Sequence, residues 1–345
     1  MIHRSIALAA AACLLAVPGA ARRDHGICAT ITEIRIDQPG ADLDEYFELS
    51  GFPGMSLTGL YYVVVGDGPA GSGEIEHVTD LTGLFMPEDG RFLCAEPTYS
   101  LGGQVDFITP LNFENGDNVT HYVVTNFTGA VGQDIDLNDD GIPEMTPWAG
   151  NCDRIALIVE PNPPATTEFH YGPPTVGPDG GSVPGHVIRC PDDFGTFEIG
   201  AFETGVNDTP GVANSTLLAD VDRLSLMAGG TQTMTLCPGF AFVGQSYLVL
   251  GSISGTSPGV LIQGVTVPLQ FDAYTQFTFS NPNAPPLQGG FGSIGFLGKN
   301  HPTLKVPAGT DPALAGLAVY HAYGVFDDDL NLTHVSNALT TVLDP

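Results

Sequence analysis

The stretch DEYFELSGFPGMSLTGLYYVVVGDG, residues 44–68, carries the clearest fold signal in the chain. Its EYFELS segment, 45–50, alternates polar and apolar residues, which is typical of a β-strand. LYYVVVG, 60–66, is a continuous apolar run of strand length. A turn rich in Gly and Pro separates the two segments, because these residues favour turns and break regular structure. Short strands joined by such turns predict a β-sandwich.

Further segments of the same kind extend this prediction over the whole chain. In residues 27–214 the expected strands are ATITEIRI, RFLCAE, THYVVTNF and RIALIVE. In residues 216–345 they are RLSLMAG, TQTMTLC, SYLVLGSIS, TQFTFSN, GSIGFLG, GLAVYHAYGVF and VSNALTTVL. The pattern fades between 160 and 215, where a Pro- and Gly-rich stretch predicts an ordered excursion over the surface. We expect an all-β protein with one sandwich at 27–214 and a second sandwich or jelly roll at 216–345.

Composition supports this class and limits the partners. The chain has 345 residues, enough for about two domains of ~150 residues each. It holds 44 Gly and 28 Pro with only 14% charged residues, which suits a loop-rich β protein. With 39 Asp and Glu against 10 Lys and Arg, the formal charge of −29 repels nucleic acid and anionic membrane surfaces. Cations are the natural small partners.

The N-terminal segment reads as a secretory signal. Residues 1–21 begin with His3 and Arg4, continue with an apolar run too short to span a bilayer, and end in small residues. No later stretch is long and apolar enough for a membrane anchor, so we expect a secreted protein without membrane insertion.

The cysteines fit an exported chain, because disulfides persist in oxidising compartments. The mature chain would keep five, so at most two internal bridges form and one thiol remains. We predict a bridge between Cys152 and Cys190. No CxxC motif supports a zinc ribbon or a redox site. The five are Cys28, Cys94, Cys152, Cys190 and Cys237.

Several segments, in order, resemble the lamin tail domain family as found in secreted bacterial proteins. The most specific are EYFEL, the NGDN turn at 115–118 and TPGVAN at 209–214; ITEIRI, MPEDGRFLCA and CDRIALIV also match. The resemblance covers about 27–214. It implies an immunoglobulin-like β-sandwich, no catalytic residues, and a role in attachment or interaction.

The chain departs from this family at one core position. Where family members often have a Trp, it has Gly59-Leu60-Tyr61, so Tyr61 or Tyr62 is expected to supply the core aromatic. Residues 216–345 resemble a C-terminal module of large secreted proteins from planctomycete-like bacteria, which implies no activity.

QDIDLNDDGIPEMTPW, residues 133–148, is a candidate calcium loop. Asp136, Asn138 and Asp140 alternate and Gly141 follows, as in D-x-[DN]-x-[DN]-G loops whose oxygen ligands converge on one cation. Position 12 of the loop is Pro147 rather than Glu, and no helix is expected beside it, so this is not an EF-hand. The predicted ligands of a structural calcium ion are Asp134, Asp136, Asn138, Asp140, the Ile142 carbonyl and Glu144. The alternative is a hydrogen-bonded acidic turn without a metal.

Other motifs give weaker signals. GDGPAG, 66–71, and GTSPG, 255–259, match nucleotide-binding and nucleophile-elbow patterns, but both patterns need a following helix that is not expected here. The histidines show no zinc-site spacing, and His121 and His321 are predicted to be structural strand residues. The other acidic clusters, Asp42-Asp44-Glu45 and Asp327-Asp328-Asp329, are expected to be solvated loops.

Taken together, these features predict a non-catalytic extracellular protein that serves in adhesion, interaction or structure, with an unknown protein or glycan as partner. One alternative is a carbohydrate-binding protein, with Trp148, Tyr171, Tyr61 and Tyr62 as candidate aromatics. Another is a secreted hydrolase such as a phosphodiesterase, which would need clustered His and Asp side chains. For Trp148, the chain's single tryptophan, a role as packing anchor of the acidic loop is favoured.

Overall fold

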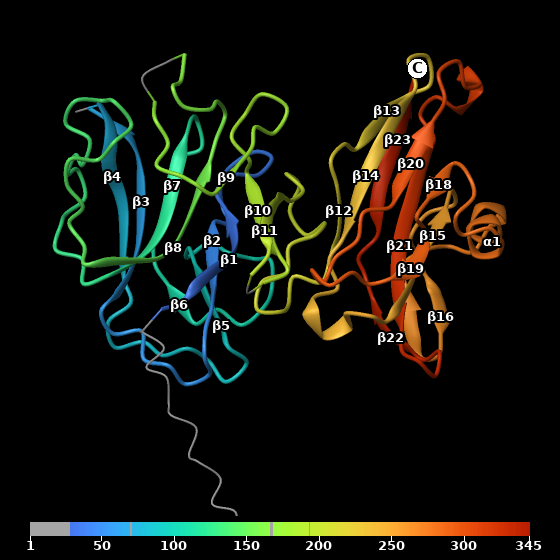
Figure 1. The fold of residues 1–345 in the computed structure, drawn as a ribbon, viewed down its shortest axis with the longest axis horizontal. Coiled ribbons are helices and arrows are strands. Elements are labelled where there is room, and N and C mark those ends of the chain that lie inside the picture. Colours follow the sequence, from blue (N-terminus) through green and yellow to red (C-terminus); the bar gives the residue numbers. More distant parts are fainter. Residues whose placement is uncertain (1–27, 70, 166–167, 193) are drawn as a thin grey trace, which may run out of the picture.

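The computed structural model describes residues 28–69, 71–165, 168–192 and 194–345. They form two lobes of β-sheet lying side by side, an N-terminal lobe with strands β1–β11 and a C-terminal lobe with strands β12–β23 (Figure 1). The predicted all-β, sandwich-like class is confirmed. The predicted signal segment, 1–21, lies outside the described residues.

The N-terminal lobe consists of two sheets. The first has the order β11 (Thr196–Ile199), β10 (His186–Cys190), β1 (Thr30–Arg35), β2 (Tyr46–Ser50), β5 (Arg91–Ala95), β6 (Phe107–Ile108). The second has the order β4 (Gly71–Asp80), β3 (Leu60–Gly68), β7 (Val119–Thr125), β8 (Gly150–Leu157), β9 (Thr175–Val176).

The core of this lobe lies between its two sheets. Alternate residues of β2, Phe47 and Leu49, point into it together with Val64 and Val123 of the opposite sheet. The ring of Tyr62 is fully buried and stacks on Phe47 with the centroids 3.7 Å apart. Of the two tyrosines that the sequence offered for the core position, it is therefore Tyr62 that fills it. Packed aromatic pairs of this kind dominate core energetics.

The stretch from 160 to 215 is not only a surface excursion, and that prediction is wrong. Its HVIRC segment is β10, a fully buried strand paired with β1 on one side and β11 on the other. A strand covered on both faces has no polar alternation. The segments on both sides of β10 are rich in Pro and Gly, so the whole region has the composition of a loop, and the pattern does not indicate a strand.

The C-terminal lobe is also built from facing sheets. One has the order β12 (Leu217–Ala219), β14 (Gly230–Leu236), β20 (Thr303–Val306), β18 (Leu287–Gln288). The other has the order β13 (Arg223–Ser225), β23 (Leu339–Asp344), β21 (Ala318–Phe326), β15 (Ser246–Ser252), β19 (Phe291–Ser293), and β22 (Leu332–Val335) pairs with β21. A hairpin of β16 (Val260–Ile262) and β17 (Val265–Val267) and two short 3-10 turns, Phe240–Phe242 and Pro312–Leu314, complete the lobe. A core of residues from both sheets, including Leu236, Tyr323 and Val325, fills the space between them.

One predicted strand, TQFTFSN, is instead part of helix α1 (Ala273–Ser280). A capping box starts this helix: the Asp272 side chain accepts from the Thr275 backbone N–H at 2.9 Å, and the Asp272 N–H donates to Thr275 Oγ1 at 3.2 Å. Such caps outweigh the modest strand preference of Thr and Phe. The helix packs on β15, where the Gly251 N–H donates to Thr278 Oγ1 at 3.0 Å.

The cysteines pair differently from the prediction. The bridges are Cys28–Cys152 and Cys190–Cys237, so the predicted Cys152–Cys190 pair is wrong. The expected count of two bridges and one thiol is confirmed for the described residues, where buried Cys94 is free. Spacing along the chain does not reveal pairing, because β1 and β8 bring Cys28 to Cys152 across 124 residues.

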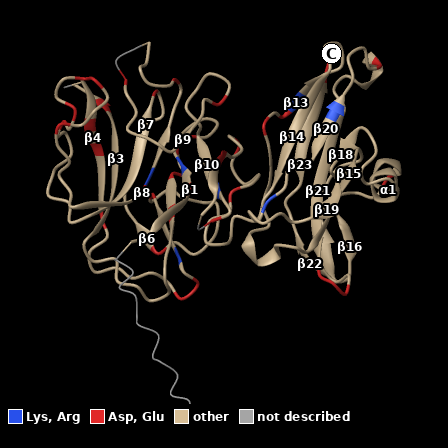
Figure 2. Ribbon diagram, viewed as in Figure 1, with Lys and Arg blue, Asp and Glu red and all other residues tan. Residues whose placement is uncertain are grey.

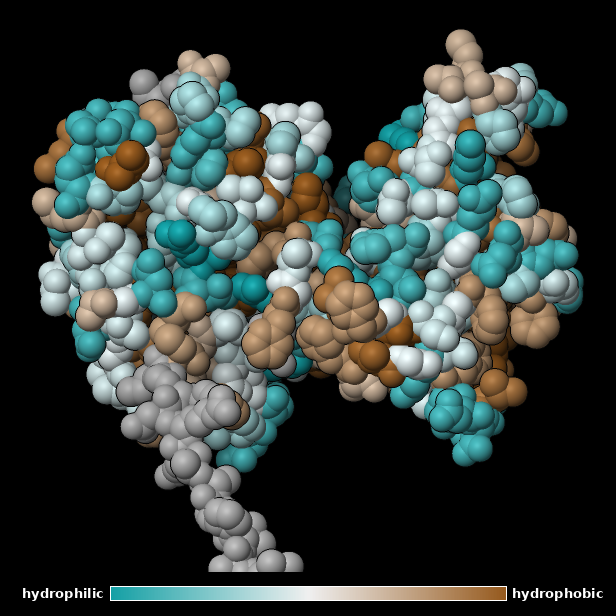
Figure 3. All heavy atoms as spheres, in the orientation of Figure 1, coloured by the Kyte–Doolittle hydropathy of each residue, from teal (hydrophilic) through white to brown (hydrophobic). Residues whose placement is uncertain are grey.

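The second bridge joins the two lobes. Nearby, Lys299 of the C-terminal lobe lies 3.0 Å from Glu198 Oε1 of β11, and the rings of Phe194 and Phe240 meet edge to face. Bulky apolar side chains are exposed at this junction (Figure 3). The exposed apolar residues of the chain segments that meet there include Phe194, Phe240, Phe296 and Leu297.

Charged residues are unevenly placed along the fold. Acidic positions lie mostly in loops and on β4, whereas the few basic positions include strands β1, β10 and β20 (Figure 2). Within the described ranges, no helix has the length and apolar character needed to cross a membrane.

Candidate functional site

The acidic loop, residues 134–144, brings three of its predicted calcium ligands together. Carboxylate oxygens of Asp136, Asp140 and Glu144 all lie within 4.8 Å of one another. Asp136 is fully buried and its two oxygens accept from the backbone N–H groups of Asp140, at 3.2 Å, and Gly141, at 2.8 Å. Glu144 reaches back over the loop and accepts from the Leu137 N–H at 2.7 Å.

The other predicted ligands have different places. Asp134 accepts from the Asp136 N–H at 2.9 Å and is not in the carboxylate cluster. Asn138 donates to Asp140 Oδ2 at 3.3 Å, so its amide lies beside the cluster. The Ile142 side chain is exposed, and its N–H donates to Asp140 Oδ1 at 2.9 Å.

Aromatic residues anchor this loop to the sheet of β3, β4, β7 and β8. The Tyr171 hydroxyl donates to Asp136 Oδ2 at 2.9 Å, and Asp139 accepts from the Ser72 N–H of β4 at 2.8 Å. Trp148, at the end of the loop segment, packs against Tyr122 and Phe127. Trp148 therefore has the packing contacts expected of an anchor.

The donor set of the loop suits calcium. Two oxygens that bind one ion at about 2.4 Å can lie no more than about 4.8 Å apart, and the three carboxylates meet this limit. Each carboxylate oxygen has two lone pairs, so the backbone hydrogen bonds leave capacity for a cation. The same hydrogen bonds would also hold an acidic turn without a metal, so the geometry fits both alternatives.

A second carboxylate cluster was not anticipated from the sequence. Asp67 at the end of β3, Asp117 before β7 and Glu168 have oxygens within 4.8 Å of one another, and Glu76 of β4 lies close by. Burial, followed by the charges of Glu114 and Asp117, raises the pKa of Glu76 to about 8. Burial, followed by the charges of Asp67 and Glu168, raises the pKa of Asp117 to about 7.

Glu76 gives this cluster a measurable pH dependence. The folded-state pKa of Glu76 lies above the usual value of 4.5, so folding favours the protonated carboxyl. The stability that comes from this protonated form is complete below about pH 4.5 and is lost as pH rises through about 8. We expect Glu76→Gln to raise the unfolding midpoint at pH 8.5 and to change it little at pH 5, with EDTA present. Thermal unfolding at both pH values checks this, and exposed Glu88→Gln is the matched control. An equal effect of Glu76→Gln at both pH values would contradict the burial argument.

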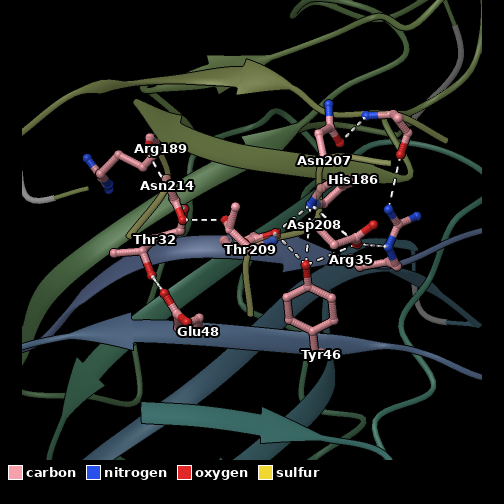
Figure 4. Close-up of polar contacts among 12 residues, drawn as sticks. Thr32, Arg35, Tyr46, Glu48, His186, Arg189, Asn207, Asp208, Thr209 and Asn214 are labelled. Carbon is pink, nitrogen blue, oxygen red and sulfur yellow. Dashed lines mark hydrogen bonds and ion pairs between the residues drawn. The ribbon is translucent and has the colours of Figure 1, made fainter. Parts of the chain in front are cut away.

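The third cluster is a buried charge network on the outer face of the β1–β2–β10 sheet, covered by the segment 200–214 (Figure 4). Glu33 of β1 accepts from the Tyr46 hydroxyl at 2.5 Å and pairs with His186 Nε2 of β10 at 2.8 Å. Thr209 adds two bonds to Glu33, from its N–H at 2.9 Å and its hydroxyl at 2.6 Å.

Arg35 and Asp208 complete the network. The Arg35 Nε lies 2.7 Å from Asp208 Oδ1, and both side chains are almost completely buried. The guanidinium also donates to the carbonyls of Asp37, Ala201 and Phe202 at 3.0–3.1 Å. Burial alone would raise the pKa of Asp208, but the charges of His186 and Arg35, together with hydrogen bonds from Arg35 and from the Gly205 N–H, lower that pKa.

The same segment is fastened further along β1 and β2. The Gly211 N–H donates to Glu48 Oε2 at 2.6 Å, and the Thr32 hydroxyl donates to Glu48 Oε1 at 2.7 Å. The Asn214 amide donates to the carbonyls of Thr32 and Arg189 at 2.8 and 3.0 Å. The TPGVAN stretch at 209–214 is thus a clamp that closes the N-terminal lobe.

A histidine between two carboxylates could in principle serve acid–base or metal chemistry. Here the chain itself uses these groups: Arg35 pairs with Asp208, and Tyr46 and Thr209 bind Glu33. His186 and Glu33 have no exposed side-chain surface. The network therefore acts as structural support for the clamp, and no local sequence spacing reveals it because its members lie up to 176 residues apart.

A small hollow of ≈ 240 Å³ opens beside the acidic loop. It brings together two of the four aromatics considered for sugar binding, Trp148 and Tyr171, whereas Tyr62 is in the core and Tyr61 packs on Phe127. Its lining residues are Tyr122, Gly141, Pro143, Thr146, Trp148, Asn151, Arg154, Tyr171 and Gly172.

Most of the weaker motifs have the local structure expected of them, with one exception. GDGPAG is followed by strand β4, and GTSPG by strand β16, rather than by a helix. His121 of β7 and His321 of β21 are fully buried, and burial lowers the pKa of each, to about 3 and about 4. The prediction of a solvated loop at Asp42-Asp44-Glu45 is wrong for Asp44 and Glu45, which are buried and accept backbone hydrogen bonds from Ser100 and Phe113, whereas Asp42 is exposed. The turn at Asp327 is held by its bonds with Asn331.

Comparison with known proteins adds no assignment. No model of a known protein family matches the sequence, and no curated protein matches it significantly. The resemblance to lamin tail domains therefore remains a prediction that rests on the quoted segments and the β-sandwich.

Proposed function

We propose that the protein is an extracellular, non-catalytic interaction protein in which the acidic loop holds a structural calcium ion. The convergence of the Asp136, Asp140 and Glu144 carboxylates within 4.8 Å carries this proposal. Three carboxylates at such short distances repel one another, and a bound divalent cation relieves the repulsion. The aromatic anchors hold this loop beside the hollow.

Two further observations support the extracellular and non-catalytic parts of the proposal. The two disulfide bonds favour an oxidising compartment. Of the three acidic clusters among the described residues, one contains a histidine, and its His and Glu are buried and hydrogen-bonded within the chain. A partner would be an extracellular protein or a glycan, and the strongly negative chain disfavours nucleic acid.

Calcium should stabilise the folded protein. Extracellular loops of this kind bind with Kd of about 10⁻⁴–10⁻³ M, so 10 mM calcium should add about 1.4–2.7 kcal/mol relative to EDTA. Thermal unfolding in EDTA, magnesium and calcium measures the effect. We expect the Asp140→Asn, Glu144→Gln double variant to lose it while retaining the loop's hydrogen-bond acceptors.

The matched control removes two carboxylates from another exposed acidic turn, as Asp328→Asn with Asp329→Asn. This control should respond to calcium as the wild type does. An unchanged midpoint in the wild type, or an equal rise in both double variants, would show that the acidic loop is a turn without a specific metal.

A further inference from the structure

We infer that the hollow beside the acidic loop binds a single sugar ring that carries a carboxylate, as in a hexuronic acid. This inference rests on the interaction function proposed above and gives it a ligand class. The hollow, at ≈ 240 Å³, is smaller than the ~300–1,000 Å³ typical of pockets for drug-sized ligands, and it suits a ligand of about one ring.

Trp148, which is half-buried, offers ring surface in the hollow to the C–H face of a pyranose. Tyr122 and Tyr171 are almost completely buried, so they form a fixed base, and half-buried Trp148 packs on Tyr122 with the ring centroids 5.3 Å apart. The face of an aromatic ring is negative and attracts the weakly positive C–H groups of a sugar. Tyr171 is further fixed because its hydroxyl donates to Asp136.

Arg154 gives the hollow its preference for a carboxylate. This residue of β8 is one of only 10 Lys and Arg residues in a chain with 39 Asp and Glu. Its Nε donates to the Pro173 carbonyl at 2.8 Å, which orients the guanidinium and leaves further N–H donors for a ligand. Arginine binds carboxylates through paired hydrogen bonds, whereas a neutral ring would leave this cation without its best partner.

The rim supplies hydrogen-bonding groups for sugar hydroxyls. Asn151 and Thr146 are exposed lining residues, and Trp148, which also lines the hollow, carries an indole N–H donor. Gly141 and Pro143 of the acidic loop also line the hollow. Ordering of that loop by calcium would therefore fix the shape of the hollow before the sugar binds.

The single tryptophan makes the test direct, because intrinsic tryptophan fluorescence reports on Trp148 alone. The mature protein is titrated with galacturonate, with galactose as the neutral match and with the peptide Gly-Gly-Gly as another carboxylate. Each titration is run in EDTA and in 10 mM calcium. We expect saturable fluorescence changes with galacturonate, at least about tenfold weaker binding of galactose, and no saturable response to the peptide.

Variants locate the binding. Arg154→Gln should weaken galacturonate binding about tenfold or more and leave galactose binding unchanged. Asn151→Ala, an exposed substitution that should not disturb folding, should weaken both sugars. Exposed Lys305→Gln in β20 removes the same charge far from the hollow and should bind as the wild type does.

The outcomes separate this inference from the calcium proposal. No saturable response to galacturonate in either buffer overturns the sugar site, whatever calcium does to the unfolding midpoint. Equal binding of galactose and galacturonate, or no effect of Arg154→Gln, overturns the carboxylate preference. Saturable binding of the peptide in place of the sugar assigns the hollow to a protein terminus. Sugar binding without a calcium-dependent midpoint supports this inference and overturns the calcium site.

Discussion

Replacing Arg35 with Met should lower the free energy of unfolding by about 3–5 kcal/mol, because it leaves the buried carboxylate of Asp208 without its partner. The variant also removes hydrogen bonds to the carbonyls of Ala201 and Phe202 in the covering segment and of Asp37 after β1. Denaturant unfolding at pH 7 measures the loss. The clamp should loosen first, so hydrogen exchange of residues 201–214 should accelerate more than that of β7.

The control for Arg35 is the exposed Arg223–Asp344 pair. Its two side chains reach solvent, so Arg223→Met should leave the unfolding midpoint close to that of the wild type. Combining Arg35→Met with Asp208→Leu should recover part of the loss, since the second change removes the unpaired charge. A loss for Arg35→Met no larger than for Arg223→Met would mean that the buried network does not hold the clamp.

The strands of both lobes could be predicted because their signals are local. EYFELS, LYYVVVG and THYVVTNF each contain enough alternating or continuous apolar residues to indicate a strand, and each is one in the structure. Local signals also explain two of the errors, whereas the predicted strand GSIGFLG is a strand only at its start, in β19. The helix α1 depends on a single cap at Asp272, and β10 is short and buried on both faces.

The candidate sites divide in the same way. The acidic cluster could be predicted because its proposed ligands lie within a few residues of one another, and the structure gathers Asp136, Asp140 and Glu144. The lining of the hollow could be predicted only in part. Trp148 and Tyr171 were among the candidate sugar-binding aromatics, but Arg154 lies on β8 and no sequence motif near it indicates a site. The pairing of Glu33 with His186 across 153 residues depends on the sheet order, which no local pattern specifies.

Removing the Cys28–Cys152 bridge should cost about 2–5 kcal/mol, since the bridge closes a 124-residue separation and longer loops lose more entropy on closure. The Cys28→Ser, Cys152→Ser double variant is the cleanest test of this effect. Cys28 is exposed and Cys152 only half-buried, so the new hydroxyls keep access to water. At the lobe junction, by contrast, Cys190 and Cys237 are both fully buried, and serines there would add a desolvation cost.

Denaturant unfolding without reductant compares the double variant with the wild type. The expected result is a lower midpoint, and reductant should bring the wild type at least as low because it opens both bridges. Thiol titration of the unfolded chains, both produced without the predicted signal segment, supplies the control: each should show one reactive group, Cys94. Two bridges occupy the other four cysteines of the wild type, and in the double variant two of these are replaced and the Cys190–Cys237 bridge holds the other two. An unchanged midpoint despite that thiol count would mean that β1 and β8 are held together by the sandwich core and by the Ile31 N–H bond to Asp153, with no net help from the bridge.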